Sequence, residues 1–134
     1  LGETHPDIAT DLNNLGVMYL DLGQLETARD RLARALELRR QTERPDPGLA
    51  TTLVNLGVIA RRSGDYKQAL DYFFRGLDMR QYLFGKDSLE ATATLDNIAE
   101  AFDKIGDVKQ AAAYRQQAEF NRRQRRPAPA LSAD

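Results

Sequence analysis

Few residues in this sequence are of a type that carries out chemistry. The chain contains no cysteine and a single histidine, His5, next to Pro6. These counts exclude disulfides, thiolate nucleophiles and metal sites built from several histidines or thiolates. Carboxylates are numerous, but no pair is distinguished by a buried or repeated setting, and the chain has no glycine-rich phosphate loop. We therefore expect neither an enzyme nor a bound cofactor or metal.

Three asparagines recur at a regular spacing. Asn14, Asn55 and Asn97 are separated by 41 and 42 residues, and each lies inside a segment that favours helix. Asparagine is a poor residue for a helix interior and costs some tenths of a kcal/mol relative to alanine. Its amide can donate to a carbonyl and accept from an N–H at the same time. A row of such amides is suited to holding the main chain of an extended peptide.

Neighbouring positions extend this candidate surface. Val17 and Val58 would supply apolar contacts, and Arg61 and Arg62 would be available to a carboxylate. The alternative is that the asparagines are simply inherited with the repeat or bond between neighbouring repeats. The peptide-binding hypothesis assigns contacts to Asn13, Asn14, Val17, Asp21, Asn55, Val58, Arg61, Arg62, Asn97, Glu100 and Lys104.

The elements that position these residues follow from the prolines and glycines. All five prolines lie outside residues 48–126, and Pro6 and Pro47 suit the first turn of a helix. Asp46, Asp65 and Asp107 are expected N-caps, and Asp87 with Glu90 matches a capping box. Glycines 23, 64 and 106 are expected to end helices. The sequence predicts six helices, at about 6–21, 24–41, 47–62, 65–83, 88–104 and 107–124.

The six helices form three copies of one unit. A shift of 41 residues superposes Leu12-x-Asn14-Leu15-Gly16 on residues 53–57, and a further shift of 42 reaches residues 95–99. A helix–turn–helix unit repeated at a fixed period is the signature of a solenoid. We expect the core from apolar and small residues at helical spacing: Ile8, Leu12, Leu15, Gly16, Tyr19, Leu53, Leu56, Gly57, Ala60, Leu95, Ile98, Ala99 and Phe102, facing Ala28, Ala69 and Ala111.

The repeated unit resembles the tetratricopeptide repeat, and its length of about 42 residues is similar to the kinesin-light-chain-type subclass. The residues that carry the resemblance are Leu12, Leu15, Gly16, Tyr19, Gly23, Ala28, Leu32, Ala35 and Leu36. It implies an all-α fold, a right-handed α-solenoid of three repeats and six antiparallel helices. The repeats would span about residues 1–42, 43–84 and 85–124, followed by a flexible tail at 125–134.

The resemblance also implies a function. Arrays of this kind present a concave groove lined by the first helix of each repeat, so we expect a non-enzymatic scaffold that binds a peptide or partner protein there. The alternative is a structural or oligomerisation module of a larger multidomain protein. The residues preceding the asparagines are Asn13, Val54 and Asp96. They lack the basic residues of the carboxylate clamp in chaperone-binding relatives, so we do not expect such a clamp.

Charge and hydropathy limit the other partners. The net charge is −1 and no apolar run approaches the roughly 18 residues of a membrane helix, so we expect a cytoplasmic location and no membrane contact. Arg39, Arg80 and Arg122 are expected near second-helix C-termini, where they would complement helix dipoles. The Arg-rich segment 122–126 is short and lacks interleaved aromatics, so nucleic-acid binding is not expected.

The two ends of the array differ. Arg115, Glu119 and Asn121 replace apolar residues of the earlier copies, which indicates a polar outer face on the last helix. Leu1–Gly2 aligns with residues 84–85 between repeats two and three, so we expect a further repeat before residue 1. The first helix then presents an uncovered apolar edge of Ile8, Met18 and Leu22, through which we expect self-association into a homo-oligomer. We expect the second repeat to cover the equivalent residues of the third repeat, Ala91, Ala101 and Ile105.

Overall fold

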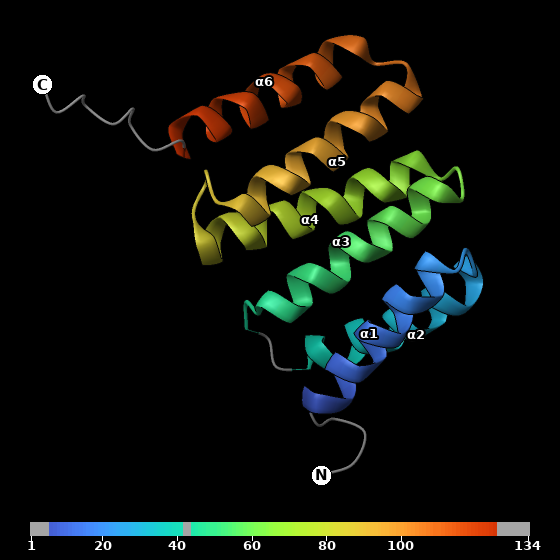
Figure 1. Ribbon diagram of the computed structural model, residues 1–134. Helices are drawn as coiled ribbons and strands as arrows, with labels where there is room; N and C mark the ends of the chain where they lie inside the picture. The colour runs from blue at the N-terminus through green and yellow to red at the C-terminus, as the bar shows by residue number, and fades with distance from the viewer. Residues whose placement is uncertain (1–5, 42–43, 126–134) are drawn as a thin grey trace, which may run out of the picture.

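The computed structural model describes residues 6–41 and 44–125, and this part of the chain contains helices and no strand. The helices pair antiparallel and stack into an elongated array (Figure 1). Every predicted helix end agrees with the structure to within one residue. The helices are α1 Pro6–Asp21, α2 Leu25–Arg40, α3 Pro47–Arg62, α4 Tyr66–Phe84, α5 Leu89–Ile105 and α6 Val108–Arg125. The predicted tail lies outside the described residues from residue 126 onward.

The helix ends follow local chemistry. Asp46, Asp65 and Asp107 each accept a hydrogen bond from a backbone N–H in the first turn of the following helix. Gly106 ends α5 with a φ of 94°, a conformation that other residues adopt only with strain. One cap differs from the prediction: the N-cap of α5 is Ser88, whose hydroxyl accepts from the Ala91 N–H, rather than Asp87.

Small residues allow the two helices of each repeat to approach closely. A Cβ atom at Gly16 would lie 2.5 Å from Cγ of Leu32, and one at Gly57 would lie 2.5 Å from the Phe73 ring. Ala28, Ala69 and Ala111 on the second helices are fully buried, as the sequence predicts. The glycines are therefore required by the facing side chains and not by an unusual backbone conformation.

The repeats stack through two apolar clusters. One joins α1 and α2 to α3 through Leu20, Leu32, Leu56 and Ile59. The other joins α3 and α4 to α5 and α6, and Phe73 lies fully buried in it. Three partly buried rings, Phe74, Phe102 and Tyr114, pack against this second cluster and against one another.

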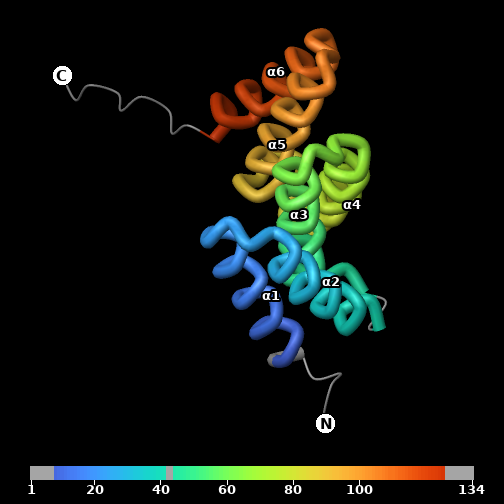
Figure 2. The backbone as a smooth tube through the Cα atoms, turned by 90° about the vertical axis from the view of Figure 1, so that its right-hand side faces the viewer, coloured from blue at the N-terminus to red at the C-terminus, as the bar shows by residue number. Residues whose placement is uncertain are grey.

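The first and second helices of the repeats are spaced differently. Among the described helices, the backbone of α3 approaches those of α1 and α5 closely, whereas the backbones of α2, α4 and α6 do not approach one another. The array therefore curves toward its first-helix side (Figure 2). We call the exposed surface of α1, α3 and α5 the inner wall and that of α2, α4 and α6 the outer side. No helix in the described part is long and apolar enough to cross a membrane.

Three sequence-based expectations about burial are wrong. Leu15 is 40% exposed instead of buried, because no described helix covers that face of α1. Ile105 is 47% exposed, although we expected the preceding repeat to cover it. Asn121 is only 2% exposed and does not belong to a polar outer face, because its amide bonds to α5 and to the loop before it.

Candidate functional site

Asn14, Asn55 and Asn97, which we call the asparagine register, lie on the inner wall. Asn14 is exposed, and Asn55 and Asn97 are half-buried. Asn14 and Asn55 have no hydrogen-bond partner among the described residues. Asn97 differs, because its Oδ1 accepts a hydrogen bond from the Arg61 guanidinium at 3.2 Å. Two of the three amides are therefore open to a partner's main chain, and the third bonds between neighbouring repeats.

Arg61 links the second and third repeats. Its Nη1 lies 3.1 Å from Glu100 Oε2 as well as within hydrogen-bond distance of Asn97, and its side chain is largely buried. Arg62 donates to the main-chain oxygen of Leu20 at 3.0 Å and so joins α3 to the end of α1. Arg61 is therefore not free for a carboxylate as we expected, because Glu100 already pairs with it. Arg62 is exposed and donates only to a main-chain oxygen.

Asn13 also serves the joint between repeats. Its Oδ1 accepts a hydrogen bond of 3.1 Å from the Thr52 hydroxyl of α3. The same hydroxyl lies 2.9 Å from the main-chain oxygen of Gly48, also in α3. Thr52 is fully buried and Asn13 is half-buried. This contact assigns Asn13 to the α1–α3 interface, so it does not belong with the exposed amides of the register.

The remaining predicted residues lie on the same three first helices as the asparagines. Val17 and Val58 are half-buried, and Val58 packs against both apolar clusters. Asp21 and Lys104 are exposed near the ends of α1 and α5. The structure thus provides two free amides with apolar side chains beside them and the Arg61–Asn97–Glu100 contact at the α5 side.

The arginines near the second-helix C-termini bridge helices instead of only facing their own helix dipoles. Arg39 of α2 contacts Asp46 at 2.8 Å and Thr10 at 2.8 Å. Arg80 of α4 donates to Thr94 at 2.9 Å, and burial lowers the pKa of its guanidinium while Glu90 opposes that shift. Sequence reasoning missed these links, although the alignment of Arg39, Arg80 and Arg122 on one repeat position was a signal for them.

No group of three or more histidine, cysteine, aspartate or glutamate side chains in the described ranges is placed to hold a metal ion. The polar groups of the inner wall are amides, which can both donate and accept hydrogen bonds, and an ion pair between repeats.

Together these features define a helical repeat array with a polar inner wall. A family model described as tetratricopeptide repeat matches residues 1–41 and 48–124. The chain belongs to the tetratricopeptide repeat family, whose members generally mediate protein–protein interaction and are typically non-catalytic scaffolds. No curated protein sequence matches this chain.

Solved structures share the fold. BtubC (BKLC) from P. vanneervenii has a TM-score of 0.84 and 26% identity over 98% of this chain and 54% of that one. The TPR domain of Arabidopsis FLU has a TM-score of 0.78 and 19% identity, covering 88% of this chain and 97% of that one. A putative kinesin light chain of Podosopora anserina with nearly identical TPR-like repeats has a TM-score of 0.76 and 17% identity over 95% and 61%. The chain thus spans little more than half of two of these proteins.

Proposed function

We propose that this chain is an interaction scaffold whose inner wall binds an extended segment of a partner protein. The observation that carries the proposal is the pair of amides at Asn14 and Asn55, which stand in register on adjacent first helices without a hydrogen-bond partner among the described residues. Each amide can both donate to and accept from a peptide group. Val17 and Val58 provide apolar surface beside them.

The same surface explains why asparagine occupies helical positions where it is a poor helix former. A solvent-exposed helix face usually carries glutamate, lysine or glutamine. Asn97 has a structural partner in Arg61, but Asn14 and Asn55 gain nothing comparable within the described chain. Binding of a partner's main chain would explain why asparagine is present at these two helix positions.

The proposal is tested with peptides selected from a displayed random library on the unmodified chain. Asn14→Ala combined with Asn55→Ala should weaken binding of the selected peptides by about 1–3 kcal/mol, because peptide groups buried against the wall lose their partners. The melting temperature should stay the same or rise slightly, since alanine is the better helix former. Titration calorimetry and thermal unfolding measure the two quantities.

The matched control is Gln116→Ala, which removes an exposed amide from α6. It should leave peptide affinity unchanged. Unchanged affinity in the Asn14→Ala, Asn55→Ala variant, or a marked fall in its melting temperature, would remove the basis of the proposal. Asn97→Ala is measured separately, because it also breaks the contact with Arg61.

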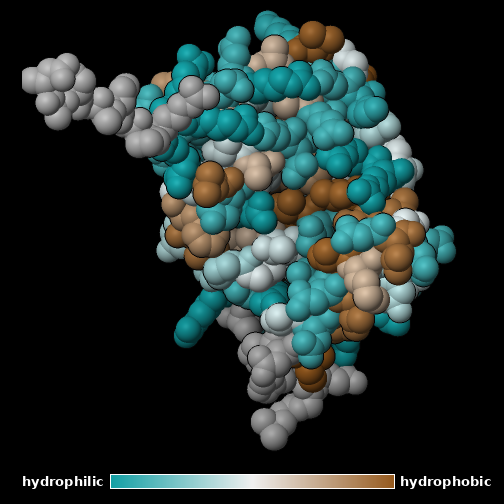
Figure 3. Space-filling model, viewed as in Figure 1, coloured by the Kyte–Doolittle hydropathy of each residue, from teal (hydrophilic) through white to brown (hydrophobic). Residues whose placement is uncertain are grey.

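A second candidate function is self-assembly through α1. Leu15, Met18 and Leu22 are 40%, 46% and 63% exposed and form a row that we call the α1 edge. Leu56 and Ile59, which occupy the positions of Leu15 and Met18 in α3, are only 3% and 1% exposed. Figure 3 shows apolar residues gathered over the lower right of the molecule, where Figure 1 places α1. Ile8 of the predicted edge is half-buried.

A further inference from the structure

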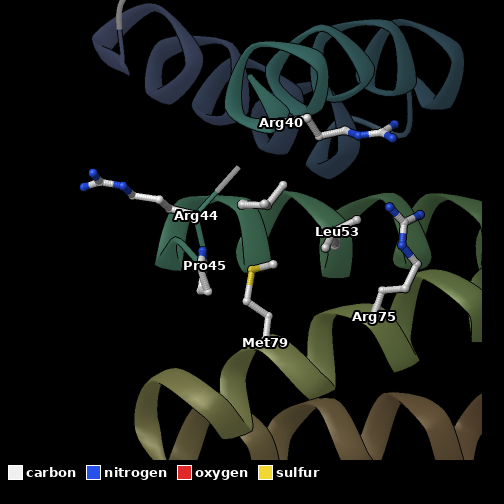
Figure 4. A pocket seen from close by; sticks show the side chains of 7 residues that line it. Arg40, Arg44, Pro45, Leu53, Arg75 and Met79 are labelled. Carbon is white, nitrogen blue, oxygen red and sulfur yellow. The ribbon is translucent and has the colours of Figure 1, made fainter. Parts of the chain in front are cut away.

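A cavity of about 380 Å³ lies between α2, α3 and α4, away from the inner wall (Figure 4). It lies in the space between α2 and α4, which both pack on α3. Leu49 and Leu53 of α3 and Met79 of α4 supply apolar lining. Its volume is at the lower end of the range for sites that bind small molecules or single side chains.

Three arginines surround this apolar lining. Arg40 and Arg44 are exposed and pair with no acidic side chain in the part of the chain that the structure describes. Arg75 lies 3.8 Å from Asp71, but both side chains are well exposed, and such pairs contribute little. In Figure 4 the guanidinium groups of Arg40 and Arg75 lie toward one end of the cavity and that of Arg44 lies toward the other. Positive charge therefore flanks the lining on both sides.

The third repeat fills the equivalent place with its own side chains. Gln81, Gln117 and Asn121 stand at the positions of Arg40, Arg75 and Met79. Asn121 is buried there, where it accepts from Gln117 at 3.0 Å and donates to Thr92 at 3.1 Å. The open, cationic cavity between α2 and α4 is therefore a property of these side chains and not a necessary result of stacking repeats.

We propose that this cavity is a second protein-binding site, which takes an acidic segment of a partner with one large aliphatic side chain between its carboxylates. The aliphatic side chain would lie on Leu49, Leu53 and Met79 as a buried anchor. Carboxylates on either side of it would pair with the arginines, whose planar donors match carboxylate geometry. A ligand with a single carboxylate would leave the positive charge at one end of the cavity without a partner.

The probe is an end-capped, fluorescein-labelled heptapeptide with a central leucine and three acidic residues on each side, measured by fluorescence anisotropy. We expect binding that weakens as sodium chloride is raised, because exposed ion pairs are screened. Replacing the acidic residues by their amides, or the leucine by serine, should each weaken binding about tenfold or more. Equal binding of the neutral peptide would overturn the proposal.

The variant Arg40→Gln, Arg75→Gln removes two of the three cations and should also weaken binding about tenfold. Both substitutions introduce the residue that the chain itself carries at the equivalent positions 81 and 117, so the fold should be retained. The matched control is Arg31→Gln, which removes an exposed charge from α2 outside the cavity and should change nothing beyond a small uniform effect of charge. The inner-wall variant Asn14→Ala, Asn55→Ala should bind this probe normally. Loss of binding in that variant, or none in Arg40→Gln, Arg75→Gln, would show that the cavity is not the site.

Discussion

At the scale of single residues, Asn121 and Asn14 show how the surroundings decide what an amide does. Asn121 is buried and donates to the Thr92 hydroxyl and to the Lys86 main-chain oxygen, so it ties α6 to α5 and to the loop before it. Asn14 is exposed and has no such partner among the described residues. The same side chain therefore contributes to stability at one position and is available for recognition at the other.

Asn121→Ala should lower the free energy of unfolding by about 1–3 kcal/mol, because the buried Thr92 hydroxyl and the main-chain oxygen of Lys86 lose a partner. Asn14→Ala should leave it unchanged or raise it by a few tenths of a kcal/mol. Urea unfolding followed by circular dichroism measures both variants against the unmodified chain. Equal, small effects in the two variants would contradict the structural role of Asn121.

At the scale of helices, the sequence predicted what depends on neighbours along the chain. Asp46, Asp65 and Asp107 cap the helices that follow them, because an N-cap bonds only two or three residues away. Predictions that depend on neighbours in space were less successful. Leu15 has the sequence features of a core residue, yet its burial would need a helix against that face of α1, and none is described there.

On the inner wall, too, the sequence predicted which helix position a residue occupies but not its contacts with other repeats. Helical spacing was enough to place Asn14 and Asn55 at the same register position of adjacent first helices, where Asn14 is exposed and Asn55 is half-buried. The partners of Arg61, Arg62 and Asn13 lie between 36 and 42 residues away, and these contacts depend on how the repeats stack. The cavity between α2, α3 and α4 was not predicted at all, because it depends on which side chains fill the space between α2 and α4 once the repeats have stacked.

The close approach of α3 and α4 gives a further prediction. In Gly57→Ala the new methyl group would lie 2.5 Å from the fully buried Phe73 ring, so we expect a loss of about 1–3 kcal/mol in unfolding free energy. In a Phe73→Ala background the same substitution should cost much less, because the ring is gone. The third repeat agrees with this expectation, because it carries Ala99 at the position of Gly57 and Arg115 at the position of Phe73. Alanine is thus found where the facing helix has no phenylalanine. Additive losses in the double variant would contradict this account.

At the scale of the whole molecule, charged side chains join the repeats on both sides of the apolar clusters. Arg61 and Arg62 cross from α3 to α5 and α1 on the inner side, while Arg80 crosses from α4 to α5. These contacts reduce the freedom of the repeats to move relative to one another. The inner wall and the cavity lie on one array, so a partner with a segment for each surface should bind with a combined affinity greater than that for either surface alone.

The exposed α1 edge leads to a prediction about the oligomeric state of the array in solution. The faces of α3 and α5 equivalent to Leu15 and Met18 are buried by the preceding repeat, so the edge has the composition of an interface between repeats. A second copy could cover it by a two-fold contact of α1 with α1, since a single apolar row can be self-complementary.

We expect the unmodified chain to show the mass of a dimer by size-exclusion chromatography with light scattering. Met18→Glu combined with Leu22→Lys should give a monomer with unchanged helical content, because both side chains are already exposed. Val108→Lys, at a position 71% exposed on α6, should remain dimeric and serves as the control. A monomeric unmodified chain at the highest concentration measured would show that the edge does not drive self-association.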